Sequence, residues 1–159
     1  MDLNNAIKFC INHSLAHVHT AIPGVVESFN GEYASVKPSI KMIYTDGKEL
    51  ELPTILKAPV MFPQTSRGGL TFDIEKGDPV LILFSEKSLE VWLNKGGVCS
   101  PGNFRRFDLS DAFVIPGLFS LNNTPELGSG TVLRNGSTTI VMSDSQVNIN
   151  DGNLTVDIS

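Results

Sequence analysis

The chain has 159 residues, of which 41% are hydrophobic and 18% are charged, a composition typical of a globular protein. Its formal net charge of −5 argues against a surface for nucleic-acid phosphates, because such surfaces concentrate Lys and Arg. The longest apolar run, residues 80–84, is far shorter than the roughly 20 residues of a membrane-spanning helix. The N-terminus also lacks the pattern of a signal peptide, and Cys10 and Cys99 predict reduced thiols in a protein made in the cytosol.

Residues 1–19 are predicted to form a short N-terminal helix. Four large apolar residues recur at helical spacing and place one stripe along it: Leu3, Ile7, Ile11 and Leu15. The Pro23-Gly24 pair then prevents the helix from continuing.

Residues 20–97 are predicted to form a small closed barrel, either SH3-like or an OB-fold. Apolar residues alternate in short runs that are separated by the turn signals Asn30-Gly31, Asp46-Gly47 and Lys76-Gly77-Asp78. The expected strands cover residues 22–29, 33–38, 40–44, 49–53, 58–62, 70–74 and 79–84. Residues 88–92 are expected to form a turn or short helix that packs Trp92 on the barrel.

Residues 98–127 are interpreted as an ordered connector, since their phenylalanines make the segment too apolar for a free linker. The connector holds one charged cluster: Arg105, Arg106, Asp108 and Asp111. These residues either pair between chains and fix the register of subunits, or belong to a solvated loop in which such pairs have little value. The neighbouring phenylalanines favour pairing between chains.

Residues 128–159 read as short strands with one apolar face. The apolar positions alternate with polar ones and are Ile140, Met142, Val147, Ile149, Leu154, Val156 and Ile158. Burying each side chain would contribute roughly 2 kcal/mol, whereas ordering the backbone costs at least about 1 kcal/mol for every residue. The segment therefore needs a sheet to lie on or identical copies to intertwine with, which predicts an oligomeric β-structured stalk.

No catalytic residue, metal ligand or cofactor is predicted, and we expect the chain not to be an enzyme. The sequence contains no GxSxG, P-loop or GxGxxG motif. Glu49 and Glu51 fit the wet face of a hairpin better than a pair of carboxyl groups across a cleft. His17 and His19 have a spacing that could bind a metal, but no further ligand accompanies them.

An ordered series of short motifs extends over about residues 15–120. It consists of Thr20-Ala21-Ile22-Pro23-Gly24-Val25-Val26, Leu70-Thr71-Phe72, Lys76-Gly77-Asp78, Leu83-Phe84-Ser85, Trp92, Gly96-Gly97, residues 105–113 and Pro116-Gly117. No single motif is diagnostic, but the series resembles the N-terminal region of membrane-puncturing central spike proteins from contractile-tailed bacteriophages.

The resemblance implies an all-β protein in which a short helix and an OB-fold collar precede a trimeric, intertwined β-helical needle. The needle would lie in the virion, at the centre of the tail baseplate, and would cross the host outer membrane when the sheath contracts. In a homotrimer the seven apolar stalk residues would line the three-fold axis. The stripe of Leu3, Ile7, Ile11 and Leu15 would dock on the tail hub, unless the helix packs on its own barrel.

One departure from this family concerns the tip. Needles of the family commonly end in HxH pairs from three chains that hold an iron ion, whereas all three histidines here are near the N-terminus. Either a separate protein supplies the tip, with any iron it holds, or the chain is a fragment, and no metal site is carried over.

Two other classes of function stay open at this stage. An OB-fold module for nucleic acid or carbohydrate could use Tyr33 and Tyr44 for stacking, although the acidic charge opposes DNA. A non-puncturing adaptor in a tail or secretion tube would differ from a spike only in the lack of an exposed tip.

Overall fold

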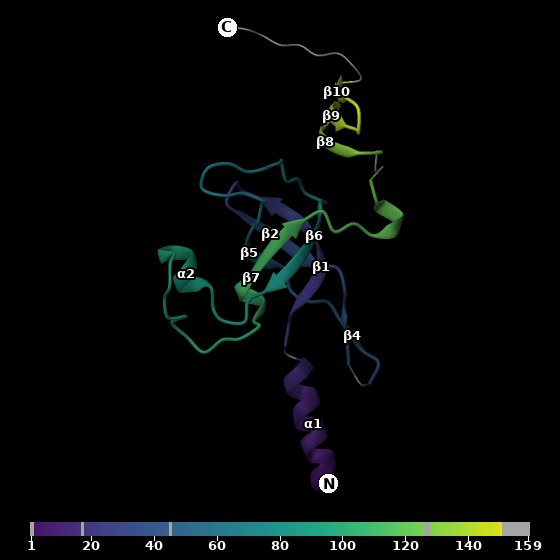
Figure 1. The fold of residues 1–159 in the computed structure, drawn as a ribbon. Helices are drawn as coiled ribbons and strands as arrows, with labels where there is room; N and C mark the ends of the chain where they lie inside the picture. The colour runs from purple at the N-terminus through teal and green to yellow at the C-terminus, as the bar shows by residue number, and fades with distance from the viewer. Residues whose placement is uncertain (1, 17, 45, 126–127, 151–159) are drawn as a thin grey trace. The chain divides into compact units, whose positions relative to one another are not determined.

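The computed structural model describes residues 2–16, 18–44, 46–125 and 128–150, and the chain divides into two compact units, Met1–Phe119 and Ser120–Ser159. The described residues are mostly β-structure, with the helix α1 (Leu3–Ala16) near the N-terminus, as the sequence predicts (Figure 1). The all-β fold class and the N-terminal helix are therefore confirmed.

The first unit is built on a five-stranded antiparallel sheet with the order β5-β2-β1-β6-β7. Its strands are β1 (Ala21–Phe29), β2 (Tyr33–Pro38), β5 (Ile55–Pro59), β6 (Pro79–Phe84) and β7 (Ala112–Pro116). The sheet curls into a half-barrel, and its two edges meet where Val60 forms a parallel bridge with Val114. The Met61 N–H donates to the Val114 carbonyl across the same junction, at 2.8 Å. This is the OB-fold-like barrel that the sequence predicts.

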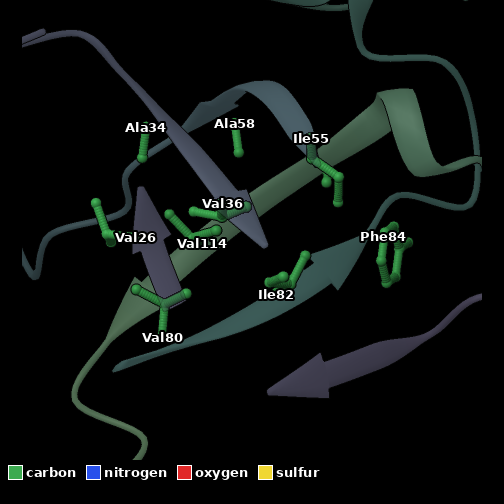
Figure 2. Packing of buried hydrophobic residues seen from close by; sticks show 10 residues of the cluster. Val26, Ala34, Val36, Ile55, Ala58, Val80, Ile82, Phe84 and Val114 are labelled. Atoms are coloured by element: carbon green, nitrogen blue, oxygen red, sulfur yellow. The ribbon is translucent and has the colours of Figure 1, made fainter. Parts of the chain in front are cut away.

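The core of the barrel comes from one face of these strands. In β2 and β6 every second residue is buried, because successive side chains of a strand point to opposite faces. Figure 2 shows the buried side chains converging from the five strands. The largest of those that are fully buried are Ile82, Val26, Val36, Val80 and Val114. Four of these five are valines, so the core is narrow and built mainly from β-branched residues.

A small hairpin extends from the barrel where Asp46-Gly47 predicts one. Its strands are β3 (Met42–Ile43) and β4 (Glu49–Leu50), paired through Met42 and Leu50. The Asp46 carboxylate accepts from the Lys48 N–H at 3.0 Å, and Gly47 takes a positive φ of 81°. Local turn chemistry therefore accounts for this element.

Three expectations about the barrel differ from the structure. The strand expected at residues 58–62 is β5, which begins earlier, at Ile55. Residues 70–74 form no strand, and the preceding segment contributes only a single bridge between Gln64 and Gly69. The fifth barrel strand is instead β7, which lies within the segment interpreted as a connector. The barrel sheet therefore extends beyond residue 97, where the sequence analysis ended it.

Between β6 and β7 the chain forms the short helix α2 (Glu90–Lys95) and the 3₁₀ helix η1 (Leu109–Asp111). The short helix expected around residues 88–92 is therefore present. Trp92 is half exposed and lines the same groove as Pro59 and Phe113 of the barrel.

The second unit contains a three-stranded antiparallel sheet with the order β10-β9-β8. Its strands are β8 (Thr131–Asn135), β9 (Thr138–Met142) and β10 (Val147–Ile149), and they follow the 3₁₀ helix η2 (Leu121–Asn123). Asn135 pairs with Thr138 around a two-residue turn in which Gly136 has a positive φ of 58°. This sheet is the part of the predicted stalk that the structure describes, and Leu154, Val156 and Ile158 lie outside the described residues.

The centre of the barrel leaves no room for a side chain at Gly24. A Cβ there would lie 2.5 Å from Ile82 Cδ1 and 3.0 Å from the Lys37 carbonyl oxygen, and Ile82 is fully buried. We expect Gly24→Ala to lower the free energy of unfolding by about 1–3 kcal/mol, as overpacked cores do. Urea denaturation measures the loss. Gly68→Ala is the matched control, since nothing lies within 4 Å of its Cβ, and equal stability of the two variants would contradict the packing at Gly24.

Candidate assembly surfaces

The sheet of the second unit gathers apolar side chains on one face. Leu133 pairs with Ile140, which pairs with Ile149, and Met142 pairs with Val147. Paired residues of an antiparallel ladder share a face and side chains alternate along each strand, so these five residues lie on the same face. We call this set the apolar sheet face.

The apolar sheet face is exposed. Val147 is 61% exposed, and Leu133 and Met142 are also exposed, while Ile140 and Ile149 are partly buried. Large apolar side chains grouped in one patch mark an interaction site far more often than single ones do.

Sequence reasoning placed four of the five residues of this face together and omitted Leu133. The alternation of apolar and polar residues also predicts Leu133 on this face, because it continues across the turn that contains Gly136.

The charged cluster of the connector is built around Asp111, which is 2% exposed. The Arg105 Nε donates to Asp111 Oδ2 at 3.0 Å, and its Nη2 donates to Asp111 Oδ1 at 3.2 Å. The Leu89 N–H and the Ser88 hydroxyl also donate to Asp111 Oδ1, at 2.9 and 3.2 Å. Asn103 Nδ2 and Arg105 Nη2 both reach the buried Ser88 hydroxyl oxygen. We call Ser88, Asn103, Arg105 and Asp111 the Arg105 clamp.

The Arg105 clamp ties three segments together, since Ser88 precedes α2, Asn103 and Arg105 lie on the connector, and Asp111 precedes β7. Hydrogen bonding to Asp111 raises the pKa of the Arg105 guanidinium, which therefore stays charged. A buried carboxylate is stable only when it is paired and hydrogen-bonded, and Asp111 meets both conditions within its own chain.

The other two charged residues of the cluster are less enclosed. Arg106 Nη2 lies 3.1 Å from Glu86 Oε1, and both side chains are exposed. The Ser110 hydroxyl and N–H both donate to Asp108, which lowers the pKa of the Asp108 carboxyl. The structure thus places Arg105 and Asp111 in one pair within the chain, and pairing of the four residues between chains stays a prediction.

The stripe predicted on α1 is exposed along its whole length. Leu3, Ile7, Ile11 and Leu15 are each at least half exposed, and no residue of α1 is buried. Phe9 is exposed on the opposite side of the helix. The stripe is therefore accessible for contact with another surface.

Among the residues that the structure describes, no three His, Cys, Asp or Glu side chains are grouped so that they could hold a metal ion. The His19 ring packs against the Phe84 ring in a tilted arrangement with centroids 5.4 Å apart, while His17 lies outside the described residues. No helix in the described ranges has the length and apolar character needed to span a membrane.

Comparison of the sequence with known protein families identifies the family of the barrel. Residues 22–117, which include all five barrel strands from Ile22 onward, match the sequence model of the Phage protein Gp138 N-terminal domain. The chain belongs to this family. No curated protein matches it. The match makes the chain a bacteriophage protein and supports a structural role in the virion.

The Arg105 clamp provides a test of how the first unit is held together. Replacing Arg105 by Ala leaves the buried Asp111 carboxylate with only the Ser88 and Leu89 donors. Losing one partner of a fully buried pair costs about 3–5 kcal/mol, and the partial exposure of Arg105 reduces our expectation to roughly 2–3 kcal/mol. Urea unfolding of the purified chain measures this loss. Arg106→Ala is the control, expected to cost at most about 1 kcal/mol because its pair is exposed, and comparable losses would contradict the distinction.

Proposed function

We propose that the chain is the central spike of a phage tail baseplate, that it forms a homotrimer, and that it punctures the host envelope when the tail contracts. The family supports a protein of the virion, and the resemblance of the barrel sequence to spike collars supports the position within it. We assign no catalytic step to the chain.

The observation that carries the proposal is the apolar sheet face. Its five side chains would each contribute about 1.5–3 kcal/mol if they were fully buried, and three of them are exposed in one chain. Across the described residues, exposed large hydrophobic side chains outnumber buried hydrophobic ones by 25 to 11. A surface of this kind is stabilised by association, because identical copies can cover one another's apolar faces.

The apolar sheet face alone is compatible with two copies packed face to face as well as with three around an axis. The sequence resemblance favours three. In that arrangement Ile140, Met142, Val147 and Ile149, joined by Leu133, would point toward the three-fold axis. The opposite face, which carries Val132, Val141 and Asn148, would point away from it.

A rod of this construction suits a passive puncturing device. Strand edges that pair between chains leave no free backbone donors or acceptors, so the rod resists unfolding without any added cofactor. The force would come from sheath contraction, and the spike would need only stiffness. Any separate tip protein would be added at the distal end.

The exposed stripe on α1 is then the surface that we propose to dock on the tail hub. A helix with an apolar stripe binds a hydrophobic groove through residues at i and i+4 spacing, and Leu3, Ile7, Ile11 and Leu15 have this spacing.

The oligomeric state is the first test. Light scattering on a sizing column should give a mass three times 17.2 kDa that persists on dilution. Ile149→Asp places a charge on the apolar sheet face and should dissociate the trimer. Asn148→Asp adds the same charge to the adjacent residue on the opposite face of β10 and should leave the mass unchanged. A wild-type monomer would contradict the proposed homotrimer. A trimer that persists in Ile149→Asp would contradict burial of the apolar sheet face at the three-fold axis. A dimer would indicate two-fold packing of this face instead.

Puncturing is tested with particles complemented by each variant. Wild-type chain should be labelled by antibody at the distal end of the baseplate, and infection should release a periplasmic marker. Ile149→Asp particles that adsorb and contract should release less of the marker than Asn148→Asp particles. Normal release by Ile149→Asp particles would reject the puncturing role, while micromolar binding of single-stranded DNA by the purified chain would favour a nucleic-acid module.

Docking of α1 on the tail hub predicts a defect in incorporation that is separate from loss of the trimer. Changing both Ile7 and Ile11 to Asp should abolish incorporation into particles, measured by immunoblot, while the purified chain stays trimeric. Asn5 and Asn12 lie on the opposite side of α1, so changing both of these to Asp is the matched control. Loss of the trimer in the Ile7 and Ile11 variant would show instead that α1 contributes to association of the copies.

A further inference from the structure

The connector carries a fully exposed aromatic side chain, that of Phe104. Phe104 is 102% exposed, although both of its neighbours are fixed to the protein. Asn103 donates to the buried Ser88 hydroxyl at 3.2 Å, and Arg105 is bound to Asp111 at 3.0 Å. The Arg105 N–H also donates to Asn103 Oδ1 at 3.0 Å, which fixes the backbone on either side of Phe104.

The outward position of Phe104 follows from this anchoring. Residues 103–107 alternate between partly buried and exposed, as they do along an extended segment. The Arg105 clamp uses the inward positions 103 and 105, so position 104 must face away from the barrel. An exposed aromatic ring that is held in place loses little conformational entropy on binding and is therefore a good anchor for an interface.

The same unit carries an apolar groove that could receive such an anchor. The groove has a volume of about 560 Å³ and is lined by residues of the segment after β5, of α2 and of β7. Its lining includes the large apolar side chains of Met61, Phe62, Leu89, Trp92, Leu93 and Phe113. Met61 and Trp92 are each about half exposed, so the groove is accessible from solvent. We call it the Trp92 groove.

The exposed anchor and the Trp92 groove lie on different sides of α2. Successive helical residues are rotated by about 100°, so Leu89, Trp92 and Leu93 share one side and Val91 lies on the other. The connector approaches the Val91 side, since a Cβ on Gly102 would come within 2.8 Å of Val91 Cγ2. An anchor and a groove on different sides of one subunit suit a head-to-tail contact, which closes into a ring when the rotation between subunits allows it.

We propose that Phe104 of each copy inserts into the Trp92 groove of the next copy, so that a ring of contacts joins the collars of the oligomer. Each copy contributes Phe104 and the Trp92 groove once, so a closed ring uses every Phe104 and every Trp92 groove once. This inference rests on the proposed function, because it requires the chain to form a cyclic oligomer.

The area available explains why the contact would act only within the oligomer. A buried aromatic side chain removes roughly 150–250 Å² from water. Phe104 and the groove surface that it covers therefore amount to a few hundred Å², well below the ~1,200 Å² of a small stable interface. Copies already joined through their second units would present the anchor at an effective concentration of the order of mM, which a small contact can exploit.

Trp92 is the single tryptophan of the chain, so its fluorescence reports directly on the groove. In the wild-type trimer we expect Trp92 to be shielded from acrylamide. Phe104→Ala should keep the trimer mass, shift the emission to longer wavelength and increase quenching. Leu56→Ala is the matched control, because Leu56 is also exposed on the barrel but does not line the groove, and it should change neither property. In the dissociated Ile149→Asp chain, adding Phe104→Ala should leave the emission unchanged.

A disulfide between copies gives an independent test. Cys10 and Cys99 are exposed and can be replaced by Ser. Differently tagged chains carrying Phe104→Cys or Met61→Cys should then form a disulfide between the two tags when the co-purified oligomer is oxidised with copper phenanthroline. Leu56→Cys in place of Met61→Cys should not, and equal cross-linking of the two would contradict the contact.

The outcomes separate this inference from the proposed function. A trimer in which Trp92 is equally quenched with and without Phe104 would overturn the ring of collar contacts but would not affect the proposal that the chain is a spike. A wild-type monomer would overturn both. Shielding of Trp92 that develops only when tail hub or lipid vesicles are added would assign the groove to that partner and would also overturn the contact between copies.

Discussion

The structure depends on one constraint, which is that a curled sheet of five short strands can bury only its inner face. That face is filled by small β-branched side chains such as Val36, Val80 and Val114, which pack closely around Ile82. The barrel consequently has no interior left for its remaining apolar residues. Trp92, Phe104 and the stripe on α1 are all exposed, so the chain presents apolar surface for contacts with other molecules.

The Arg105 clamp determines where part of this apolar surface is presented. By joining the start of α2 to the connector and to η1, it converts a long connection between β6 and β7 into a fixed feature. Because Asp111 is buried, loss of its hydrogen bonds would be costly, and this cost holds the connector in one position. The same hydrogen bonds that stabilise the barrel therefore also position Phe104.

The sequence predicts the elements that depend on local chemistry and misses those that depend on distant partners. The α1 helix, the hairpin at Asp46-Gly47 and the alternation from Ile140 to Ile149 follow from spacing and turn residues. Strand β7 has only five residues, and its role comes from pairing with β6, which no local pattern reveals. The run at residues 70–74 alternates but pairs with no strand, and Arg105 and Asp111 meet within the chain only because the connector folds back.

In the proposed assembly, two kinds of surface have different roles. The apolar sheet face presents adjacent side chains over three strands, and such a face can supply most of the association free energy. The Phe104 anchor and the Trp92 groove are each too small to join free subunits, but they can fix the rotation of collars that are already joined. An assembly that must transmit force along its axis needs both properties, because strong association without a fixed rotation would allow the subunits to twist under load.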